Sequence, residues 1–367
     1  MIDVKKFFSV LKKNNINFFC GVPDSVLKKT NSYFSNLKKE NHIILHNEGG
    51  AVATAAGYAL RTKKIPCVYL QNSGLGNIVN PVLSLVHKKV YSIPILFLIG
   101  WRGSPGKKDE PQHTAQGKKT LRLLGLLDIE YLIIKNDLDL NKIGTFIKKN
   151  FKNKKSSALL VEKNTFLQKK IKPKKKINYP GMLRHEVIEC IIQNKQKNLK
   201  IFSTTGYTSR ELYQLRKLKN SNIIDFYNVG AMGHTNMISL GYSLNNKNKI
   251  LCLDGDGSLL MHMGGMAVIS HYGGKNFKHI LFNNQQHESV GGQLTPIKNV
   301  DFKLLSKGAG YKNYFFCKNL GDFKNKYKKF ISSKGPSFFE IRVKPGTLNE
   351  LGRPKNFTLI KKKFQNS

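Results

Sequence analysis

Acidic residues are scarce in this chain. Among its 367 residues, Asp and Glu number 22 against 62 Lys and Arg, which gives a formal net charge of +40. Such a balance is typical of nucleic-acid-binding proteins. However, the lysines are spread along the whole sequence, only eight arginines occur, and no helix-turn-helix, zinc-finger or aromatic RNA-binding motif is present. We therefore expect no specific nucleic-acid partner, although the positive field would attract polyanions at low salt and steer anionic substrates.

Cysteines and long apolar runs are also few. The five cysteines lie far apart and form no C-x-x-C pair, which argues against a disulfide framework and against a zinc site. The longest apolar stretch, residues 90–101, contains Pro94 and is too short to span a bilayer. Residues 1–19 place apolar side chains on one helical face and do not form a secretory signal. These features predict a cytoplasmic protein with no membrane partner.

Short apolar segments that alternate with helical patterns predict the fold class. Strands are expected near residues 16–20, 43–46, 66–70, 93–99, 129–134 and 158–161, and again near 200–203, 223–227, 249–254, 279–283, 313–317 and 337–342. This order predicts an α/β protein with two doubly wound parallel-sheet domains. A basic, proline-punctuated stretch at 167–182 is predicted to be a solvated linker between a domain at 1–166 and one at 183–367.

Polar residues follow two of the predicted strands of the second domain. Gly255-Asp256-Gly257 ends the apolar run at 249–253, and the pair Asn283-Asn284 ends the next one, with Asn284 lying 28 residues after Asp256. Ligands bind at the carboxyl ends of strands in open α/β sheets. A carboxylate, an amide oxygen and the backbone carbonyl of Gln286 would form an all-oxygen site that suits Mg²⁺. An isolated Gly-Asp-Gly more often closes a turn, so the prediction of a metal site depends on the second polar strand end, Asn283-Asn284.

This two-part pattern resembles the signature of thiamine diphosphate-dependent enzymes, in which Gly-Asp-Gly is followed at about this distance by Asn-Asn. The resemblance implies that Asp256, Asn284 and the Gln286 carbonyl hold Mg²⁺, which holds the cofactor diphosphate. Further cofactor contacts are expected at Gly255, Gly257 and Ser258. The chain departs from the usual pattern at Gln285-Gln286, where small residues are common, and this puts the shape of the loop in question.

The resemblance also implies a carboxylate for the pyrimidine ring of the cofactor. Glu48 follows the predicted strand at 43–46 and opens a helix of small residues; the alternative is an ordinary helix-start carboxylate. The resemblance implies that Glu48 hydrogen-bonds a pyrimidine nitrogen of the cofactor and takes part in proton transfer. The Gly230 carbonyl is expected to accept from the pyrimidine amino group, and Asn72 is expected to contact the cofactor. Met232 is expected to support the bend between the cofactor rings; the alternative is that Met232 is an ordinary core residue.

Several less general stretches resemble the phosphonopyruvate decarboxylase family. They are Gly21–Ser25, Gln71–Asn77, Gly100–His113, His287–Gln293 and Leu351–Pro354, and the likeness runs from about residue 16 to 355. It implies decarboxylation of 3-phosphonopyruvate, an anionic 2-oxo acid, to phosphonoacetaldehyde and CO₂ in phosphonate biosynthesis. The length of 367 residues and the two runs of predicted strands further predict that the middle domain of longer thiamine diphosphate decarboxylases is missing.

Candidate substrate and proton-transfer residues follow from the same likeness. Arg102, Lys107 and Lys108 lie in a glycine- and proline-rich loop that would bind the phosphonate, although each could be an ordinary surface cation. The catalytic candidates are Glu48, Asp24, His113 and His287. Asp24 could equally be a turn residue, and a lone histidine is usually structural.

The resemblance also implies an oligomeric state, and two alternative functions are considered beside the main one. In this superfamily the cofactor lies between the first domain of one subunit and the second domain of another, which implies at least a homodimer with sites at the subunit interface. Sulfopyruvate differs from phosphonopyruvate by one charge and is the alternative substrate. A non-catalytic basic scaffold that binds polyanions is the remote alternative, which the intact Glu48, Asp256 and Asn284 oppose.

Overall fold

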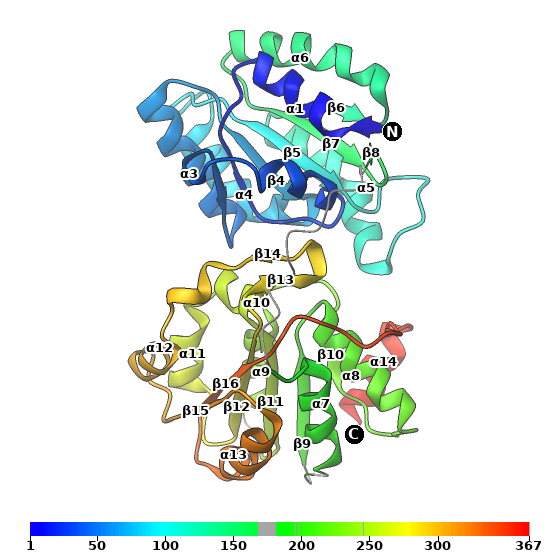
Figure 1. The fold of residues 1–367 in the computed structure, drawn as a ribbon, viewed down its shortest axis with the longest axis vertical. Coiled ribbons are helices and arrows are strands. Elements are labelled where there is room, and N and C mark those ends of the chain that lie inside the picture. Colours follow the sequence, from blue (N-terminus) through cyan, green and yellow to red (C-terminus); the bar gives the residue numbers. More distant parts are fainter. Residues whose placement is uncertain (168–180, 195, 197, 245, 367) are drawn as a thin grey trace. The chain divides into compact units, whose positions relative to one another are not determined.

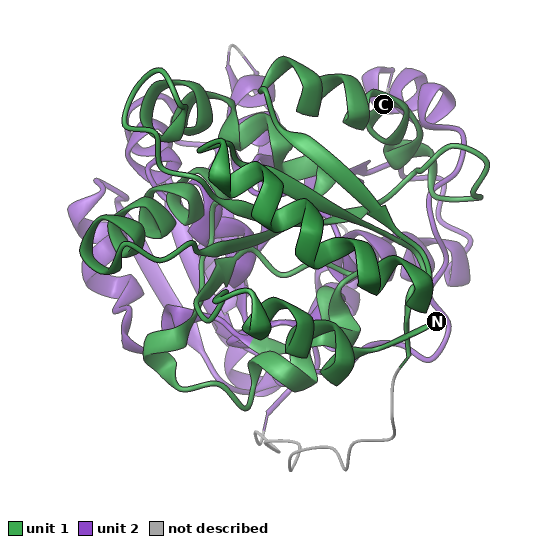
Figure 2. Ribbon diagram, turned by 90° about the horizontal axis from the view of Figure 1, so that it is seen from above, with its two compact units in different colours: residues 1–174, 290–293 green, residues 175–289, 294–367 purple. Residues whose placement is uncertain are grey.

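The computed structural model describes residues 1–167, 181–194, 196, 198–244 and 246–366. The chain forms two compact units, Met1–Lys174 with Val290–Gln293 and Lys175–Ser289 with Leu294–Ser367, which are coloured separately in Figure 2. The predicted linker at 167–182 falls largely on residues 168–180, which lie outside the described residues. The boundaries 1–166 and 183–367 therefore stay predictions.

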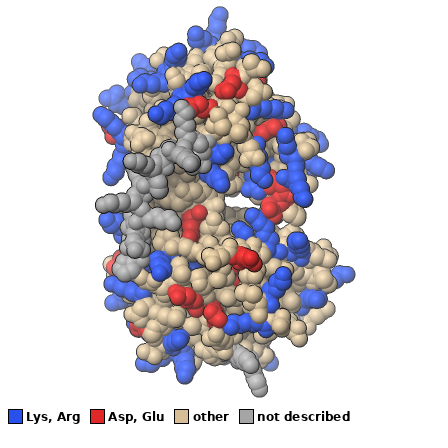
Figure 3. Space-filling view, turned by 45° about the vertical axis from the view of Figure 1, so that its right-hand side comes forward, with Lys and Arg blue, Asp and Glu red and all other residues tan. Residues whose placement is uncertain are grey.

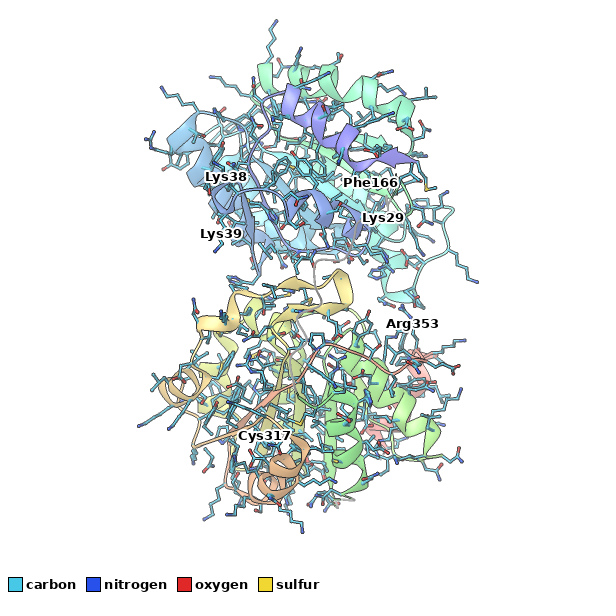
Figure 4. The ribbon with its side chains drawn as sticks, in the orientation of Figure 1. Lys29, Lys38, Lys39, Phe166, Cys317 and Arg353 are labelled. Atoms are coloured by element: carbon cyan, nitrogen blue, oxygen red, sulfur yellow. The ribbon has the colours of Figure 1, made fainter. Side chains whose placement is uncertain are left out.

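The first unit contains a six-stranded parallel sheet in the order β3-β2-β4-β5-β7-β6. Its strands are β2 (Phe19–Gly21), β3 (His42–Ile44), β4 (Cys67–Gln71), β5 (Leu96–Trp101), β6 (Glu130–Ile134) and β7 (Ser157–Glu162). Its helices are α1 (Val4–Lys13), α2 (Asn31–Phe34), α3 (Glu48–Thr62), α4 (Leu75–Pro81), α5 (Pro111–Leu126) and α6 (Leu140–Lys152). A short pair, β1 (Ile2–Asp3) and β8 (Phe166–Leu167), brings together the two ends of the described part of this unit. Lys29 Nζ donates to the Phe166 carbonyl at 2.8 Å beside this pair (Figure 4).

The second unit repeats the architecture with the strand order β10-β9-β11-β12-β16-β15, again parallel throughout. Its strands are β9 (Leu199–Ser203), β10 (Phe226–Tyr227), β11 (Lys249–Gly255), β12 (Phe277–Asn283), β15 (Asn313–Cys317) and β16 (Ser337–Arg342). Its helices are α7 (Arg184–Gln193), α8 (Tyr207–Leu218), α9 (Thr235–Ser243), α10 (Asp256–Met261), α11 (Gly265–Tyr272), α12 (Phe302–Gly308), α13 (Leu320–Ser332) and α14 (Phe357–Gln365). A small hairpin-like pair, β13 (Gln286–His287) and β14 (Gln293–Leu294), follows β12.

Each sheet is buried on both faces, which explains the continuous apolar runs of its strands. In β4, Val68 and Leu70 enter the core beneath α3, α4 and α5, whereas Cys67 and Tyr69 enter the core beneath α1 and α6 (Figure 1). In the second unit, α7, α8 and α13 cover one face, and α9 to α12 with α14 cover the other. The predicted fold class is confirmed, and each of the twelve predicted strands overlaps a strand of the structure.

Most lysine and arginine side chains lie on the surface, although Arg184, Lys200, Arg216 and Lys278 are buried. On the face in Figure 3, lysine and arginine side chains are distributed over both units and do not gather in one stripe. Within the described residues, no helix has both the length and the apolar character needed to cross a bilayer. All five cysteines are free thiols, and four of them are buried.

Candidate active site

The two predicted magnesium ligands of the second unit leave neighbouring strands at the same edge of the sheet. β11 and β12 are paired in parallel, with Gly255 opposite Phe282, so Asp256 and Asn284 each lie just beyond this register. Asp256 is the first residue of α10, and Asn284 follows the last residue of β12. The sheet topology therefore brings these side chains to one edge, as the sequence predicted.

Asp256 connects the two loops through hydrogen bonds. Its Oδ1 accepts from the Gly257 N–H at 2.8 Å, and its Oδ2 accepts from Thr295 Oγ1 at 3.1 Å. The Gln285 backbone also hydrogen-bonds this carboxyl, and Gln285 in turn accepts from the Thr295 N–H at 2.9 Å. Burial raises the pKa of Asp256 to about 7, against the lowering effect of these hydrogen bonds. A buried carboxylate of this kind is stabilised by a cation, because the cation replaces the lost hydration.

The asparagine loop orients the second oxygen ligand. Asn284 is buried, its Oδ1 accepts from the Gln286 N–H at 3.0 Å, and its Nδ2 donates to Glu288 Oε2 at 3.1 Å. Gln285 adopts a φ of +60°, a conformation that costs a non-glycine residue about 1 kcal/mol. This strained turn is the structural counterpart of the departure that the sequence shows at Gln285-Gln286. The donor set of carboxylate, amide oxygen and backbone carbonyl fits Mg²⁺.

Three further predicted residues of the second unit lie together. A Cβ atom built on Gly257 would lie 2.8 Å from His287 Nδ1 and 3.7 Å from Met232 Cε. The glycine is therefore required here because the imidazole packs directly against the backbone of α10. Met232 is half-buried in a turn that closes with the His234 N–H donating to Ala231 at 3.2 Å.

Two other cofactor candidates of this unit, Gly255 and Ser258, lie at the start of α10. Ser258 Oγ accepts from Thr204 Oγ1 at 2.9 Å, and a Cβ on Gly255 would meet only Thr204, at 3.9 Å. Gly230 is exposed. Thr204 and Thr295 could not be identified from the sequence, because neither belongs to a motif and only the fold brings each of them to this edge of the sheet.

In the first unit, Glu48 is a buried carboxylate at the start of α3. Its Oε2 accepts from Asn77 Nδ2 at 2.7 Å, and a Cβ on Gly74 would lie 2.3 Å from Oε1. Asn47, whose side chain accepts from two backbone N–H groups, caps the helix. Burial raises the pKa of Glu48, against the hydrogen bond from Asn77 that lowers it. A carboxyl group whose pKa lies above its usual range is suited to exchanging protons near neutral pH.

Asp24 is another buried carboxyl group of the first unit. Its Oδ2 accepts from the N–H groups of Val26 at 2.8 Å and Leu27 at 2.9 Å, whereas Oδ1 has no hydrogen-bond partner among the described residues. A Cβ on Gly100 would lie 2.0 Å from Oδ2, so only glycine fits at that point of β5. Burial raises the pKa of Asp24 to about 6.

The loop that was predicted to bind substrate is organised by Asp109. Arg102 donates to both carboxylate oxygens of Asp109, from Nε at 2.8 Å and from Nη2 at 2.5 Å, and also to Ser25 at 2.9 Å. Hydrogen bonds from Arg102 and from two backbone N–H groups outweigh burial and hold the pKa of Asp109 below its usual range. The Arg102 guanidinium is thus hydrogen-bonded to Asp109 and Ser25, whereas the side chains of Lys107 and Lys108 in the same loop are exposed.

Asn72 and His113 support this loop from two sides. The Asn72 side chain accepts from the Arg102 N–H at 3.0 Å and donates to the Arg102 carbonyl and to Thr120, each at 2.9 Å. These contacts use both N–H donors of the amide and one lone pair of Oδ1, and the predicted cofactor contact of Asn72 stays a prediction. His113 is half-buried in the first turn of α5, where a Cβ on Gly103 would lie 2.1 Å from its carbonyl oxygen.

Asp24→Asn is expected to change how stability depends on pH. Asp24 keeps its proton up to about pH 6 when folded but only to its ordinary value of 3.8 when unfolded, so folding takes up a proton between these values. Wild-type stability therefore falls as the pH rises through this window, by about 3 kcal/mol relative to the variant. Urea unfolding followed by the fluorescence of Trp101, the single tryptophan and a residue of the first unit, measures the difference. A pH-independent difference would show that Asp24 ionises normally in the folded unit.

This chain is similar to several known proteins. The model for the N-terminal TPP binding domain of thiamine pyrophosphate enzymes matches residues 4–121, and the model for the C-terminal TPP binding domain matches residues 204–341. Phosphonopyruvate decarboxylase of Streptomyces viridochromogenes is 30% identical over 97% of this chain and 92% of its own length. Sulfopyruvate decarboxylase of Methanosarcina acetivorans is 25% identical over 98% of this chain and 96% of its own length. Among solved structures, benzoylformate decarboxylase from Polynucleobacter necessarius matches 96% of this chain and 100% of its own, at 12% identity and a TM-score of 0.40.

Proposed function

We propose that this chain, which belongs to the phosphonopyruvate decarboxylase family of thiamine pyrophosphate enzymes, decarboxylates 3-phosphonopyruvate to phosphonoacetaldehyde and CO₂. One observation carries the proposal: two oxygen ligands leave adjacent parallel strands at one sheet edge, and hydrogen bonds through Thr295 and Gln285 join their loops. The cofactor is thiamine diphosphate with Mg²⁺. When bound, it supplies the nucleophilic carbon for the 2-oxo group and accepts the electrons released with CO₂.

The second unit holds the metal end of this site. Asp256, Asn284 Oδ1 and the Gln286 carbonyl are proposed to bind Mg²⁺, and Gly255, Gly257 and Ser258 to border the diphosphate. The buried, proton-retaining Asp256 supports this assignment, because a divalent cation offsets the cost of its ionisation. Gly230 and Met232 are proposed to border the pyrimidine and the bend between the rings.

The first unit handles protons and the anionic tail of the substrate. Glu48 is proposed to hold a proton at the pyrimidine nitrogen, since its carboxyl is buried and its pKa is raised. Asp24 and His113 of this unit, together with His287 of the second unit, are proposed proton donors to the substrate carbon that loses CO₂. Arg102 is proposed to shape the cationic loop through Asp109, and Lys107 and Lys108 to bind the phosphonate.

A homodimer with shared sites is part of the proposal. Glu48 and Asp256 belong to different units of the chain, and the proposed arrangement pairs Glu48 of one subunit with Asp256 of the other. Helix α3, which Glu48 begins, exposes small residues at 50, 53 and 57 together with Leu60, and a Cβ on Gly50 or Gly57 would meet nothing within 4 Å. Such a face allows close approach of a second copy. The free thiols support the proposed cytoplasmic location.

The substrate assignment is tested by offering the purified protein three acids. Phosphonopyruvate, sulfopyruvate and pyruvate are each supplied with thiamine diphosphate and Mg²⁺, and CO₂ release is measured with and without each cofactor. We expect the highest kcat/KM for phosphonopyruvate and no release without the cofactor. Equal or faster turnover of sulfopyruvate would assign the chain to the alternative substrate, and silence toward all three would favour the polyanion-binding scaffold.

Replacing Lys107 and Lys108 together by alanine is expected to raise KM for phosphonopyruvate about tenfold with little change in kcat. The physical reason is that two exposed cations contribute attraction to a dianion, and about 1.4 kcal/mol corresponds to this factor. The same replacement at Lys12 and Lys13, which are exposed at the end of α1, makes the same charge change away from the loop. Equal effects of the two double variants would show that only the general positive field matters.

A further inference from the structure

The amide of Asn284 has two ends of similar shape and opposite chemistry. Oδ1 carries lone pairs and can ligate a cation, whereas the Nδ2 group only donates hydrogen bonds. Rotation of the amide by 180° would exchange them with little change in packing. If Asn284 is a magnesium ligand, as the proposed function requires, some contact must decide which end faces the metal.

Two one-way contacts decide the orientation. Nδ2 donates to Glu288 Oε2 at 3.1 Å, and Oδ1 accepts from the Gln286 N–H at 3.0 Å. A carboxylate only accepts and a backbone N–H only donates, so a rotated amide would face oxygen with oxygen and N–H with N–H. In the observed orientation, Oδ1 uses one lone pair for Gln286 and keeps the other for a cation.

Glu288 is itself held in place from three directions. Its Oε2 also accepts from Arg184 Nη1 at 3.1 Å, and its Oε1 accepts from the Gly346 N–H at 2.5 Å. Arg184, the first residue of α7, donates further to Glu211 of α8 from Nε at 2.7 Å and from Nη2 at 3.3 Å. The side-chain exposures are 7% for Arg184, 0% for Glu211 and 14% for Glu288. A largely buried charge triad therefore anchors the carboxylate that faces Asn284.

We propose that Glu288 is a positioning residue for the metal site: by accepting from Nδ2 it turns the oxygen of Asn284 toward the cation, and the Arg184–Glu211 pair holds it there. The inference rests on the proposed thiamine diphosphate and magnesium site and adds a residue that does not touch the metal. The sequence showed Glu288 beside His287 but gave no sign of a role, because Arg184 lies 104 positions away.

The central variant is Glu288→Gln. Glutamine has one acceptor oxygen where the carboxylate has two, so its N–H₂ group must face either the Gly346 N–H or the donors of Arg184 and Asn284. Facing Gly346 it displaces the side chain that holds Asn284, and facing Asn284 Nδ2 it favours rotation of the asparagine, so both orientations weaken the hold on Oδ1. We expect the affinity for Mn²⁺, a paramagnetic substitute for Mg²⁺, to fall about 10- to 100-fold in the presence of thiamine diphosphate. Titration followed by electron paramagnetic resonance measures bound Mn²⁺ without requiring turnover, and saturating metal is expected to restore most of kcat.

Asn284→Asp separates orientation from charge. A carboxylate at position 284 presents oxygen on both sides, so it no longer needs Glu288 to orient it. In the Asn284→Asp background, Glu288→Gln is expected to leave Mn²⁺ affinity unchanged or to raise it, because glutamine can donate to the aspartate. If Glu288 acted only through its negative charge, Glu288→Gln would lower the affinity by the same factor in both backgrounds.

Glu340→Gln is a matched control. Glu340 is buried and accepts from the neighbouring asparagine, with Asn283 Nδ2 donating to Oε1 at 2.7 Å. Asn283 is not a proposed ligand, so this variant is expected to keep Mn²⁺ affinity within about twofold of wild type, whatever it costs in stability.

The outcomes are distinct. Unchanged affinity in folded Glu288→Gln, or equal losses in both backgrounds, overturns the orientation role. Wild-type protein that binds no Mn²⁺ with thiamine diphosphate contradicts the proposed function itself. Should Glu288→Gln fail to fold, as judged by circular dichroism, Glu288→Asp, which keeps the charge but withdraws the carboxylate from Asn284 by one methylene, takes its place in both backgrounds: a loss of Mn²⁺ affinity only with Asn284 supports the orientation role, and unchanged affinity overturns it.

Discussion

Glu48→Gln is expected to lower kcat about 10²- to 10⁴-fold, the usual range for loss of a positioned acid or base. The substitution keeps the size of the side chain, and the glutamine oxygen can still accept from Asn77 Nδ2, so the start of α3 is expected to stay intact. What disappears is the capacity to exchange a proton at that point. Cofactor affinity is expected to change by less than about tenfold, because glutamine still offers one hydrogen bond to the pyrimidine.

Stopped-flow or steady-state CO₂ release, together with calorimetric titration of thiamine diphosphate, measures both quantities. Glu130→Gln is the control, since Glu130 is a glutamate of the same unit that begins β6, at the end of the sheet opposite the proposed site, and is paired with Lys149 at 3.4 Å and with Lys155 at 3.5 Å. We expect near wild-type turnover for this control. Retained activity in Glu48→Gln would show that a different carboxylate exchanges the proton.

Asp256→Asn is expected to abolish metal-dependent cofactor binding, with a loss of at least about 100-fold in apparent Mg²⁺ affinity. The asparagine oxygen is a weaker ligand than a carboxylate for a hard divalent cation. In the metal-free protein the same change leaves an amide where the carboxyl accepts from Gly257, Thr295 and Gln285, so the melting temperature of the metal-free variant is measured beside that of the wild type.

The rise in melting temperature that thiamine diphosphate and Mg²⁺ produce in the wild type should vanish in Asp256→Asn. Asp301→Asn provides the control in the same unit. Asp301 caps α12 by accepting from the N–H groups of Lys303 and Leu304, and asparagine caps helices equally well. If Asp256→Asn keeps the full thermal shift, the metal is bound elsewhere.

The strands, and the sheet edge at which Asp256 and Asn284 both lie, could be predicted from the sequence because they depend on local patterns. A parallel strand buried on both faces is a short continuous apolar run, and both β11 and β12 show this pattern. Once the two runs are adjacent parallel strands, their polar ends must meet. The boundaries moved by a few residues at most, as in β2, where the apolar run begins before the strand does.

The partners of the site side chains could not be predicted, because they are brought together only by the fold. Arg102 is predicted to bind the phosphonate, and its ion pair with Asp109, seven positions later in the same loop, could not be predicted with it. Asn72 is predicted to contact the cofactor, and its hydrogen bonds to the Arg102 backbone and to Thr120 of α5 depend on the fold. No pattern of apolar and polar residues in the sequence predicts such side-chain contacts. Glu288 and Thr295 were missed for the same reason.

The central claim is that Glu48 and Asp256, which lie in different units, act on one cofactor molecule shared between two subunits. A hybrid dimer with Glu48→Gln in one subunit and Asp256→Asn in the other, isolated by two affinity tags, tests it. One of its two sites would contain both intact residues, and we predict about half of the wild-type turnover per dimer. Turnover no higher than that of either parent variant would contradict the account.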